Sequence, residues 1–333
     1  MASKQNPVYT VYAVSGSTKY DLTPAVLSIG LSDQQTQISK IAKVELSNMK
    51  VGSSRLTDVL NVRDRVYIYA DDGEKSGEVW RGYIWTRSYK ASVDGGVLDL
   101  KCYDNLIYFQ ESEESEFFEA GKSTQAILSA LCSKWGVSLS YSYRSITHAK
   151  LALRGTLSDI ITADVLDLVK DRTGVKYVVL SEQDVVYVKA VGANTTIYTI
   201  QAGENAIYTT SEETMQGMIT KVVILGKEDD DDRAPVEATV SGNTSKYGTL
   251  QKLINRDEET ALADAKTEAQ NIINKDGKPK WEGSIRTVDI PWIRKGDKVK
   301  VKAGDLASDY IVIGIERDID NSGKLMTLTL EAA

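Results

Sequence analysis

Two stretches, one near each end of the 333-residue chain, decide the fold: Asp64-Arg65-Val66-Tyr67-Ile68-Tyr69-Ala70-Asp71-Asp72 and Asp297-Lys298-Val299-Lys300-Val301-Lys302-Ala303-Gly304-Asp305. Each begins with an acidic and a basic residue, continues with alternating apolar and polar residues, and ends in a turn. Alternation with a period of two residues is typical of a strand with one buried face. Each stretch therefore predicts a half-buried β-strand.

The sequence that follows each stretch also matches. A second strand is predicted at 83–87 and again at 313–317, and both end in arginine. A turn that contains glycine then leads into a third alternating strand, at 97–101 or at 325–330. These patterns predict the same antiparallel three-strand unit twice. The sequence leaves open the alternative that two unrelated meanders resemble each other by chance.

Between the two strand units, a helix followed by glycine and then by strand is predicted twice. Ser123 can cap the first helix, whose apolar face runs from Ile127 to Trp135 before Gly136 ends it. The second helix begins near Ser158 and ends at Gly174, and strands follow at 175–180 and 185–188. This plan predicts a small α+β insert, with either a structural or a binding role.

The predicted fold class is α+β, mainly β, with two antiparallel β-barrel domains separated by this insert. We place the first barrel at 1–110, the insert at 111–205 and the second barrel at 206–333. The strand at 219–226 can belong to either barrel.

A third helix, over 261–273, has a narrow apolar stripe that predicts contact with a sheet, and Asn255 or Asp257 can cap it. Trp281 and Trp292 then pack under this helix or mark a protein contact.

Composition narrows the class of protein. No run approaches ~18 consecutive apolar residues, so no membrane span is expected. The first seven residues lack the apolar core of a signal peptide. The net charge is −7 and no cluster of Lys and Arg stands out, which disfavours specific binding of nucleic acid. The only cysteines, Cys102 and Cys132, are predicted to be small core residues without a disulfide.

Residues that could carry chemistry are few. The single histidine, His148, is predicted to be exposed on a polar connector, and there is no CxxC pair, so the common zinc sites are not expected. A Ser/His/Asp or Cys/His site would have to use His148. With 47 acidic residues, a pair of carboxylates for glycoside hydrolysis stays open. We predict no catalytic, cofactor-binding or metal-binding residue, and no enzyme.

Two acidic runs, at 111–116 and 228–233, precede the insert and Ala234-Pro235 respectively. Consecutive carboxylates in the second run lack the alternating ligand positions and the glycine of a calcium-binding loop. We therefore expect the second run to be a solvated, mobile loop between strands.

The chain resembles the baseplate hub proteins of contractile phage tails and tail-like bacteriocins, specifically the XkdQ/YqbQ-type hub of PBSX-like particles. The resemblance covers nearly the whole chain and depends on the order of several segments. These are Leu166–Val179, Lys227–Asp232, Tyr247–Gln251, the helix at Ala261–Ile273, Gly277-Lys278-Pro279 and Gly296–Val299.

The resemblance implies a structural protein with two tail-tube-like domains that forms a homotrimer, a ring with pseudo-sixfold symmetry. Its partners would be the tail tube protein, the central spike protein and other baseplate proteins, with the tape-measure protein as a further candidate. The protein would lie in the baseplate of a phage tail or tail-like particle, assembled in the bacterial host cytoplasm.

Two other classes of function remain. One is a tail-associated peptidoglycan hydrolase, which an activity assay would identify. The other is a receptor- or carbohydrate-binding tail module, for which clustered Trp and Tyr would be the sign. The five tryptophans, at positions 80, 85, 135, 281 and 292, are dispersed in the sequence, which weakens this second alternative.

Overall fold

The computed structural model of the chain describes residues 6–91, 96–142, 145–227, 234–256 and 261–333. The acidic run predicted at 228–233 lies outside these residues. The chain divides into two compact units, the first formed by Met1–Thr210 with Gly283–Ala333 and the second by Ser211–Glu282. Across the described ranges, no helix is both long and apolar enough to cross a membrane.

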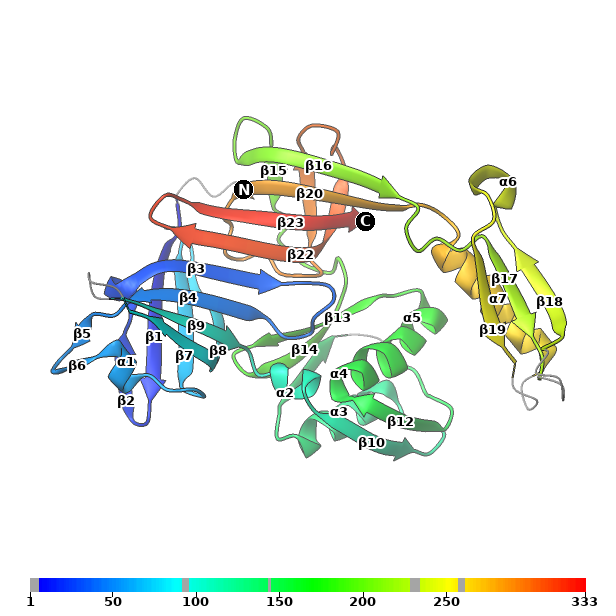
Figure 1. The fold of residues 1–333 in the computed structure, drawn as a ribbon, viewed down its shortest axis with the longest axis horizontal. Coiled ribbons are helices and arrows are strands. Elements are labelled where there is room, and N and C mark those ends of the chain that lie inside the picture. The colour runs from blue at the N-terminus through cyan, green and yellow to red at the C-terminus, as the bar shows by residue number, and fades with distance from the viewer. Residues whose placement is uncertain (1–5, 92–95, 143–144, 228–233, 257–260) are drawn as a thin grey trace. The chain divides into compact units, whose positions relative to one another are not determined.

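A large, mainly antiparallel sheet of 13 strands dominates the first unit (Figure 1). Its strands are β1 (Val8–Ser15), β2 (Thr18–Asp21), β3 (Val26–Asp33), β4 (Ile41–Ser47), β7 (Arg65–Asp71), β8 (Ser76–Lys90), β9 (Val97–Tyr103), β15 (Thr199–Gln201), β16 (Ala206–Thr214), β20 (Lys280–Val288), β21 (Lys298–Lys302), β22 (Asp309–Asp320) and β23 (Lys324–Ala332). They follow the order β16-β20-β23-β22-β3-β4-β9-β8-β7-β1-β2, while β21 pairs with β22 and β15 pairs with β21.

The predicted three-strand unit occurs twice in this sheet, as β7-β8-β9 and as β21-β22-β23. Both are antiparallel meanders in which the long second strand lies between the other two. In each, the pairing of the second strand with the third shifts by one residue, at Trp85 in β8 and at Ile313 in β22. The connectivity predicted from the sequence is therefore confirmed.

The two meanders also share their hydrogen bonds. The backbone N–H of Arg63 donates to Ile84 O (2.6 Å), and Ile84 N–H donates to Asp64 O (2.9 Å). In the second copy, Gly296 N–H donates to Val312 O (2.7 Å), and Val312 N–H donates to Asp297 O (2.9 Å).

The turns before the first strands match as well. Arg63 and Gly296 both have a positive φ, 71° and 87°. Asp64 accepts the backbone N–H of Asn61, and Asp297 accepts that of Arg294 in the same way. Chance resemblance between two meanders does not account for this agreement.

The prediction of two separate barrels requires correction. One sheet continues through both copies, because β22 pairs with β3 from Ile315↔Asp33 to Asp320↔Ser28. Among the described residues the strand path stays open, with β2 and β16 at its ends. The copies also differ at one flank, where β1 is antiparallel to β7 but β15 is parallel to β21.

The first meander has a core of alternating inward residues, including Val66, Ile68, Ile84, Leu98 and Leu100, all nearly inaccessible to solvent. Short elements close this core: a 3₁₀ helix (Thr23–Ala25), β5 (Lys50–Val51), β6 (Ser54–Arg55) and α1 (Leu56–Val59). Ile319 of β22 belongs to the same core, so the second meander contributes directly to the packing of the first.

Trp292 also packs against this core, and its indole N–H donates to Asp72 Oδ2 (2.6 Å). Trp292 therefore does not pack under the third helix.

Between β9 and β15 the chain forms helices packed against two small sheets, and the predicted order of helix, glycine and strand occurs there twice. The elements of this segment are α2 (Ile107–Gln110), β10 (Glu113–Phe118), α3 (Thr124–Lys134), β11 (Leu139–Ser142), β12 (Leu151–Thr156), α4 (Leu157–Asp159), a π-helical turn (Ile160–Leu166), α5 (Asp167–Thr173), β13 (Tyr177–Glu182) and β14 (Val185–Ala190). Ser123 Oγ accepts the N–H of Ala126 (3.1 Å), and Gly174 ends the second helix with a φ of 73°. The helix ends were therefore predicted correctly. Part of the first acidic run lies in β10, which pairs with β12.

The second unit is a three-stranded sheet with one helix against it. Its elements are β17 (Lys221–Leu225), β18 (Val236–Ser241), α6 (Thr244–Tyr247), β19 (Gln251–Asn255) and α7 (Leu262–Asp276). The strand predicted at 219–226 is β17, and its partners are β18 and β19. The helix stripe is confirmed, because Ala265, Ala269 and Ile273 are buried against this sheet. The predicted cap is wrong: the N-cap is Ala261, Asn255 ends β19, and Asp257 lies outside the described residues.

Proline at Val299 should destabilise the second meander. Lys300 N–H donates to Tyr198 O and Val301 N–H donates to Ser308 O, so by alternation Val299 N–H faces β22. Val299→Pro removes that donor and leaves a buried carbonyl unsatisfied, which costs about 1–3 kcal/mol. Val299→Ala, which keeps the N–H, is the matched control, and urea unfolding measures both. Equal stability of the two variants would contradict the pairing.

Candidate functional site

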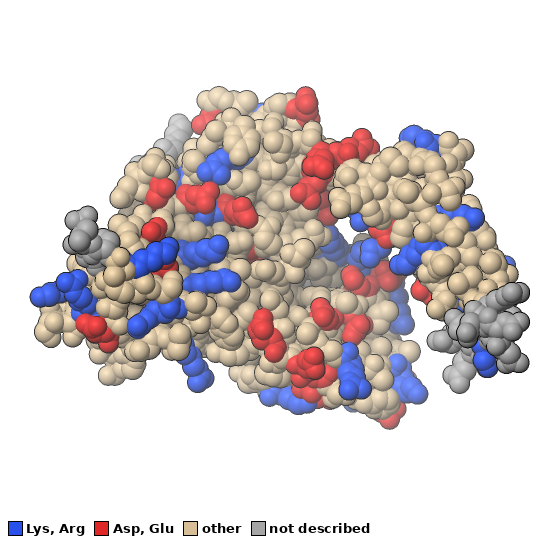
Figure 2. Space-filling view, in the orientation of Figure 1, with Lys and Arg blue, Asp and Glu red and all other residues tan. Residues whose placement is uncertain are grey.

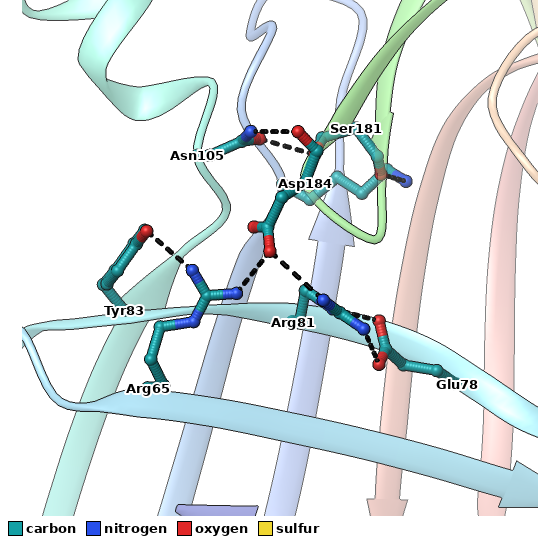
Figure 3. Close-up of polar contacts among 8 residues, drawn as sticks. Arg65, Glu78, Arg81, Tyr83, Asn105, Ser181 and Asp184 are labelled. Carbon is teal, nitrogen blue, oxygen red and sulfur yellow. Dashed lines mark hydrogen bonds and ion pairs between the residues drawn. The ribbon is translucent and has the colours of Figure 1, made fainter. Parts of the chain in front are cut away.

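Because no catalytic constellation was predicted, the candidate site is the polar junction where the insert meets the large sheet. The β13–β14 hairpin turns at Gln183 and Asp184, whose φ values of 51° and 66° are left-handed. This turn places the Asp184 carboxylate over two arginines of the first meander (Figure 3). Asp184 Oδ2 lies 2.6 Å from Arg65 Nη2 and 3.1 Å from Arg81 Nη1.

Each arginine is also held from its own meander. Arg65 Nη1 donates to Tyr83 Oη (2.6 Å), and Arg81 forms a two-bond pair with Glu78 through Nε and Nη2, both at 2.6 Å (Figure 3). The bonds to Glu78 and Asp184 raise the pKa of Arg81. With both guanidinium groups oriented in advance, the hairpin tip docks in one geometry.

Side chains next to β4 and β9 also form hydrogen bonds to the hairpin. Asn105 Nδ2 donates to Asp184 O (3.0 Å), and Ser181 Oγ donates to Asn105 Oδ1. Lys40 Nζ donates to Ser181 O (3.0 Å). Lys40 lies just before β4 and Asn105 just after β9. Together with Arg65 on β7 and Arg81 on β8, they fix one hairpin to four neighbouring strands of the sheet.

Charged groups line a pocket of about 220 Å³ beside the hairpin. Lys40 and Asp104 are buried there, and Arg81, Glu182 and Arg294 are partly buried. Burial raises the pKa of Asp104 to about 6, although Lys40 opposes the shift. Burial also lowers the pKa of Lys40 and of Arg294. The mixture of signs means that the groups compensate one another, as buried charges must.

A second buried cluster joins the two meanders. Arg317 Nε of β22 donates to Asp289 Oδ1 (3.0 Å), and Tyr9 Oη of β1 donates to the other carboxylate oxygen. Lys295 Nζ lies 2.6 Å from Asp33 Oδ1 and donates to the carbonyls of Gln34 and Gln37, both at 2.9 Å. Burial raises the pKa of Asp289, and Arg317 opposes the shift.

His148 was predicted to be exposed, and this prediction is wrong. Its side chain is 3% exposed, and Nε2 lies 2.8 Å from Thr124 Oγ1. The connector is drawn in because His148 exchanges backbone bonds with Lys122 and Gly121, which precede α3. Burial, with a smaller effect from Arg172, lowers the pKa of His148.

The two cysteines were the remaining candidates for chemistry. Cys102 and Cys132 are both buried free thiols, and burial raises the pKa of Cys132 to about 12. A thiol with so high a pKa is a poor nucleophile at neutral pH. Among the described residues, no group of three or more His, Cys, Asp or Glu is arranged to hold a metal ion.

Sequence reasoning did not find the junction. The signal was an Asp at the predicted turn between strands 175–180 and 185–188, with Arg65 in the first predicted strand and Arg81 just before the second. Neither pattern states which turn meets which strand, because the contact joins residues more than 100 positions apart.

Asp184→Asn should loosen the hairpin. Asn also tolerates a left-handed backbone, so the change removes the charge while preserving the turn. The two arginines are only about one-fifth exposed, and we expect a loss of about 1–2 kcal/mol. Chemical unfolding and hydrogen exchange in β13 and β14 measure it. Asp99→Asn, which breaks the exposed Lys90–Asp99 pair, is the control and should cost under about 1 kcal/mol.

The low pKa of His148 predicts a pH effect. Below pH ~6.5 the unfolded chain binds a proton at His148 that the folded chain does not bind until the pH is lower. This contribution to stability is therefore present above pH ~6.5 and is lost as the pH falls through the folded-state pKa. His148→Gln should flatten the fall in unfolding free energy between pH 7 and 5. Parallel curves for the two proteins would rule out this role.

Comparison with known proteins identifies a matching family and solved structures of similar fold. A family model described as YQBQ-like matches residues 33–331. No curated protein matches the chain. The structure is similar to a 43 kDa tail protein of prophage MuSo2 from Shewanella oneidensis, with a TM-score of 0.70 at 13% identity over 98% of both chains.

Two further solved structures have the same fold. A tail protein from Neisseria meningitidis has a TM-score of 0.69 at 12% identity, covering 97% of this chain and 96% of that one. A Francisella PdpA-VgrG complex has a chain with a TM-score of 0.60 at 7% identity, covering 99% of this chain and 58% of that one. Because the family model covers most of the sequence, the chain belongs to the YQBQ-like family.

Proposed function

We propose that the protein is the structural baseplate hub of a contractile tail. Three copies would form a ring of six similar strand units that joins the hexameric tail tube to the trimeric central spike. The observation that carries this proposal is the internal repeat, in which two meanders share connectivity, bulge position and turn hydrogen bonds. The fold shared with prophage tail proteins supports it.

The repeat suits an adaptor between symmetries. A hexameric ring presents six equivalent surfaces, and a trimer of a tandem repeat offers six nearly equivalent partners. The two copies differ at the β1 and β15 flank, where one pairing is antiparallel and the other parallel. Such differences recur three times around a trimer, which matches the symmetry of a trimeric spike.

One face of the large sheet is polar and hollowed, and we assign it to the lumen of the ring. It carries Lys43, Lys101 and Arg286 beside Glu45, Asp99 and Asp318, around a depression of about 630 Å³. Figure 2 shows both signs of charge over this part of the sheet. Mixed charges with no dominant sign suit a channel that must not retain DNA or a tape-measure protein.

The domain assignment follows from this proposal. Residues 1–110 and 206–333 would be the two tail-tube-like domains and 111–205 the insert, with the unit at 211–282 as an addition to the second. The partners would be the tube, the spike and other baseplate proteins, and the role would be non-enzymatic. Assembly would take place in the bacterial host cytoplasm.

A receptor- or carbohydrate-binding tail module is the second candidate, and one observation favours it. Although the tryptophans are dispersed in sequence, Trp85 lies 6.0 Å from Tyr103 and 5.9 Å from Tyr108 between ring centroids. Tyr83 contacts Tyr108 in the same group. Aromatic groups of this kind recur both in ligand sites and at protein interfaces.

The symmetry and position of the protein in its particle test the proposal. We expect a ring of three copies on the particle axis, between tube and spike, in an electron-microscopy map. Because each copy supplies two strand units, the ring should show pseudo-sixfold density at low resolution. Six copies per ring, or copies at the particle periphery, would contradict the hub, and the latter would favour the receptor-binding module. Release of soluble fragments from peptidoglycan would instead favour a hydrolase.

A further inference from the structure

The long strand of the first meander has an edge that the described part of the chain leaves open. β7 pairs with β8 from Ser76 to Tyr83 only, whereas β8 continues to Lys90. Beyond Ile84, β9 lies along one edge of β8, and no described strand lies along the other. Trp85, at the start of this open edge, is 41% exposed. Open edges of this kind favour pairing with another strand.

In the second meander, the equivalent edge is filled. The matching bulges align Trp85 with Ile313, so Arg87 corresponds to Ile315 and Ser88 to Glu316. From Ile315 onward, β22 pairs antiparallel with β3, and Glu316 lies opposite Ser32. In the second meander this edge is therefore filled by β3, the strand at the outer end of the neighbouring strand unit.

The strand that corresponds to β3 is β16. The order β16-β20-β23-β22 in the second copy repeats the order β3-β4-β9-β8 in the first. β16 ends the strand path, and apart from one bridge between Ala202 and Ala206 its outer edge has no partner strand within the described ranges. Ile207 and Tyr208 on β16 are 52% and 51% exposed. The open edges of β8 and β16 therefore correspond to the paired edges of β22 and β3. They lie at opposite ends of this run of strands.

We propose that the open edge of β8 pairs antiparallel with β16 of a second copy of this chain, and so repeats the β22–β3 contact between molecules. The inference rests on the proposed hub function and names the residues that close its ring. The contact is head-to-tail, so it closes into a ring when the rotation permits. Each copy then contributes eight strands, from β16 to β8, to one continuous sheet.

Cysteine cross-linking of full-length protein in assembled particles tests this pairing. Ser88→Cys is combined in turn with Tyr208→Cys, Thr210→Cys and Glu212→Cys, which alternation places on one side of β16. A short bifunctional thiol reagent should then give dimers and trimers on a denaturing gel for at least one pair. The native cysteines are buried and should not react.

Two control pairs calibrate the result. Ser32→Cys with Glu316→Cys, which lie opposite each other within one chain, should cross-link internally and show that the chemistry works. Ser88→Cys with Thr209→Cys, on the other side of β16, should give little product. If the internal control reacts and a threefold axial ring is present, but none of the three pairs links copies, then the edge pairing is overturned while the hub function stands. A ring of six copies, or a peripheral position, overturns both.

Discussion

The pairing of β22 with β3 is the constraint on which the rest of the first unit depends. Six residues on each strand join two meanders that would otherwise be separate sheets. The same strand carries Arg317, whose guanidinium group lies in the interior against Asp289 and the hydroxyl of Tyr9. Removing one member of such a cluster would leave a buried charge unpaired, so the cluster strongly favours one arrangement of the meanders.

Polar contacts at one hairpin tip fix the insert to this frame, beside the apolar packing of Ile38 and Leu106 in the core of the insert. The donors of these directional bonds are Arg65 on β7, Asn105 just after β9 and Lys40 just before β4. Directional bonds set an angle as well as a distance, which apolar packing does less strictly. An insert held in this way keeps one orientation relative to the large sheet.

Sequence patterns predicted what depends on near neighbours. Alternation located the meander strands, and Ser123 and Gly174 marked the helix ends where the structure has them. The patterns failed where distant residues decide the outcome. His148 sits in a polar stretch, yet its backbone bonds to residues before α3 draw it inside. Likewise, the period-two pattern of β22 is the same whether its outer edge meets solvent, a barrel partner or β3, so the continuous sheet could not be predicted.

The two meanders differ in whether the outer edge of the long strand is paired, and the tandem repeat explains this difference. A strand with the same pattern and the same bulge has a filled edge in one copy and an open edge in the other. A single chain with two repeats can satisfy only one of its two equivalent contacts internally, because the second requires a further repeat. The unsatisfied pair, β8 and β16, is therefore what a tandem repeat must leave exposed if it is to assemble into a closed ring. The aromatic and half-exposed residues along both edges are consistent with surfaces that become buried on assembly.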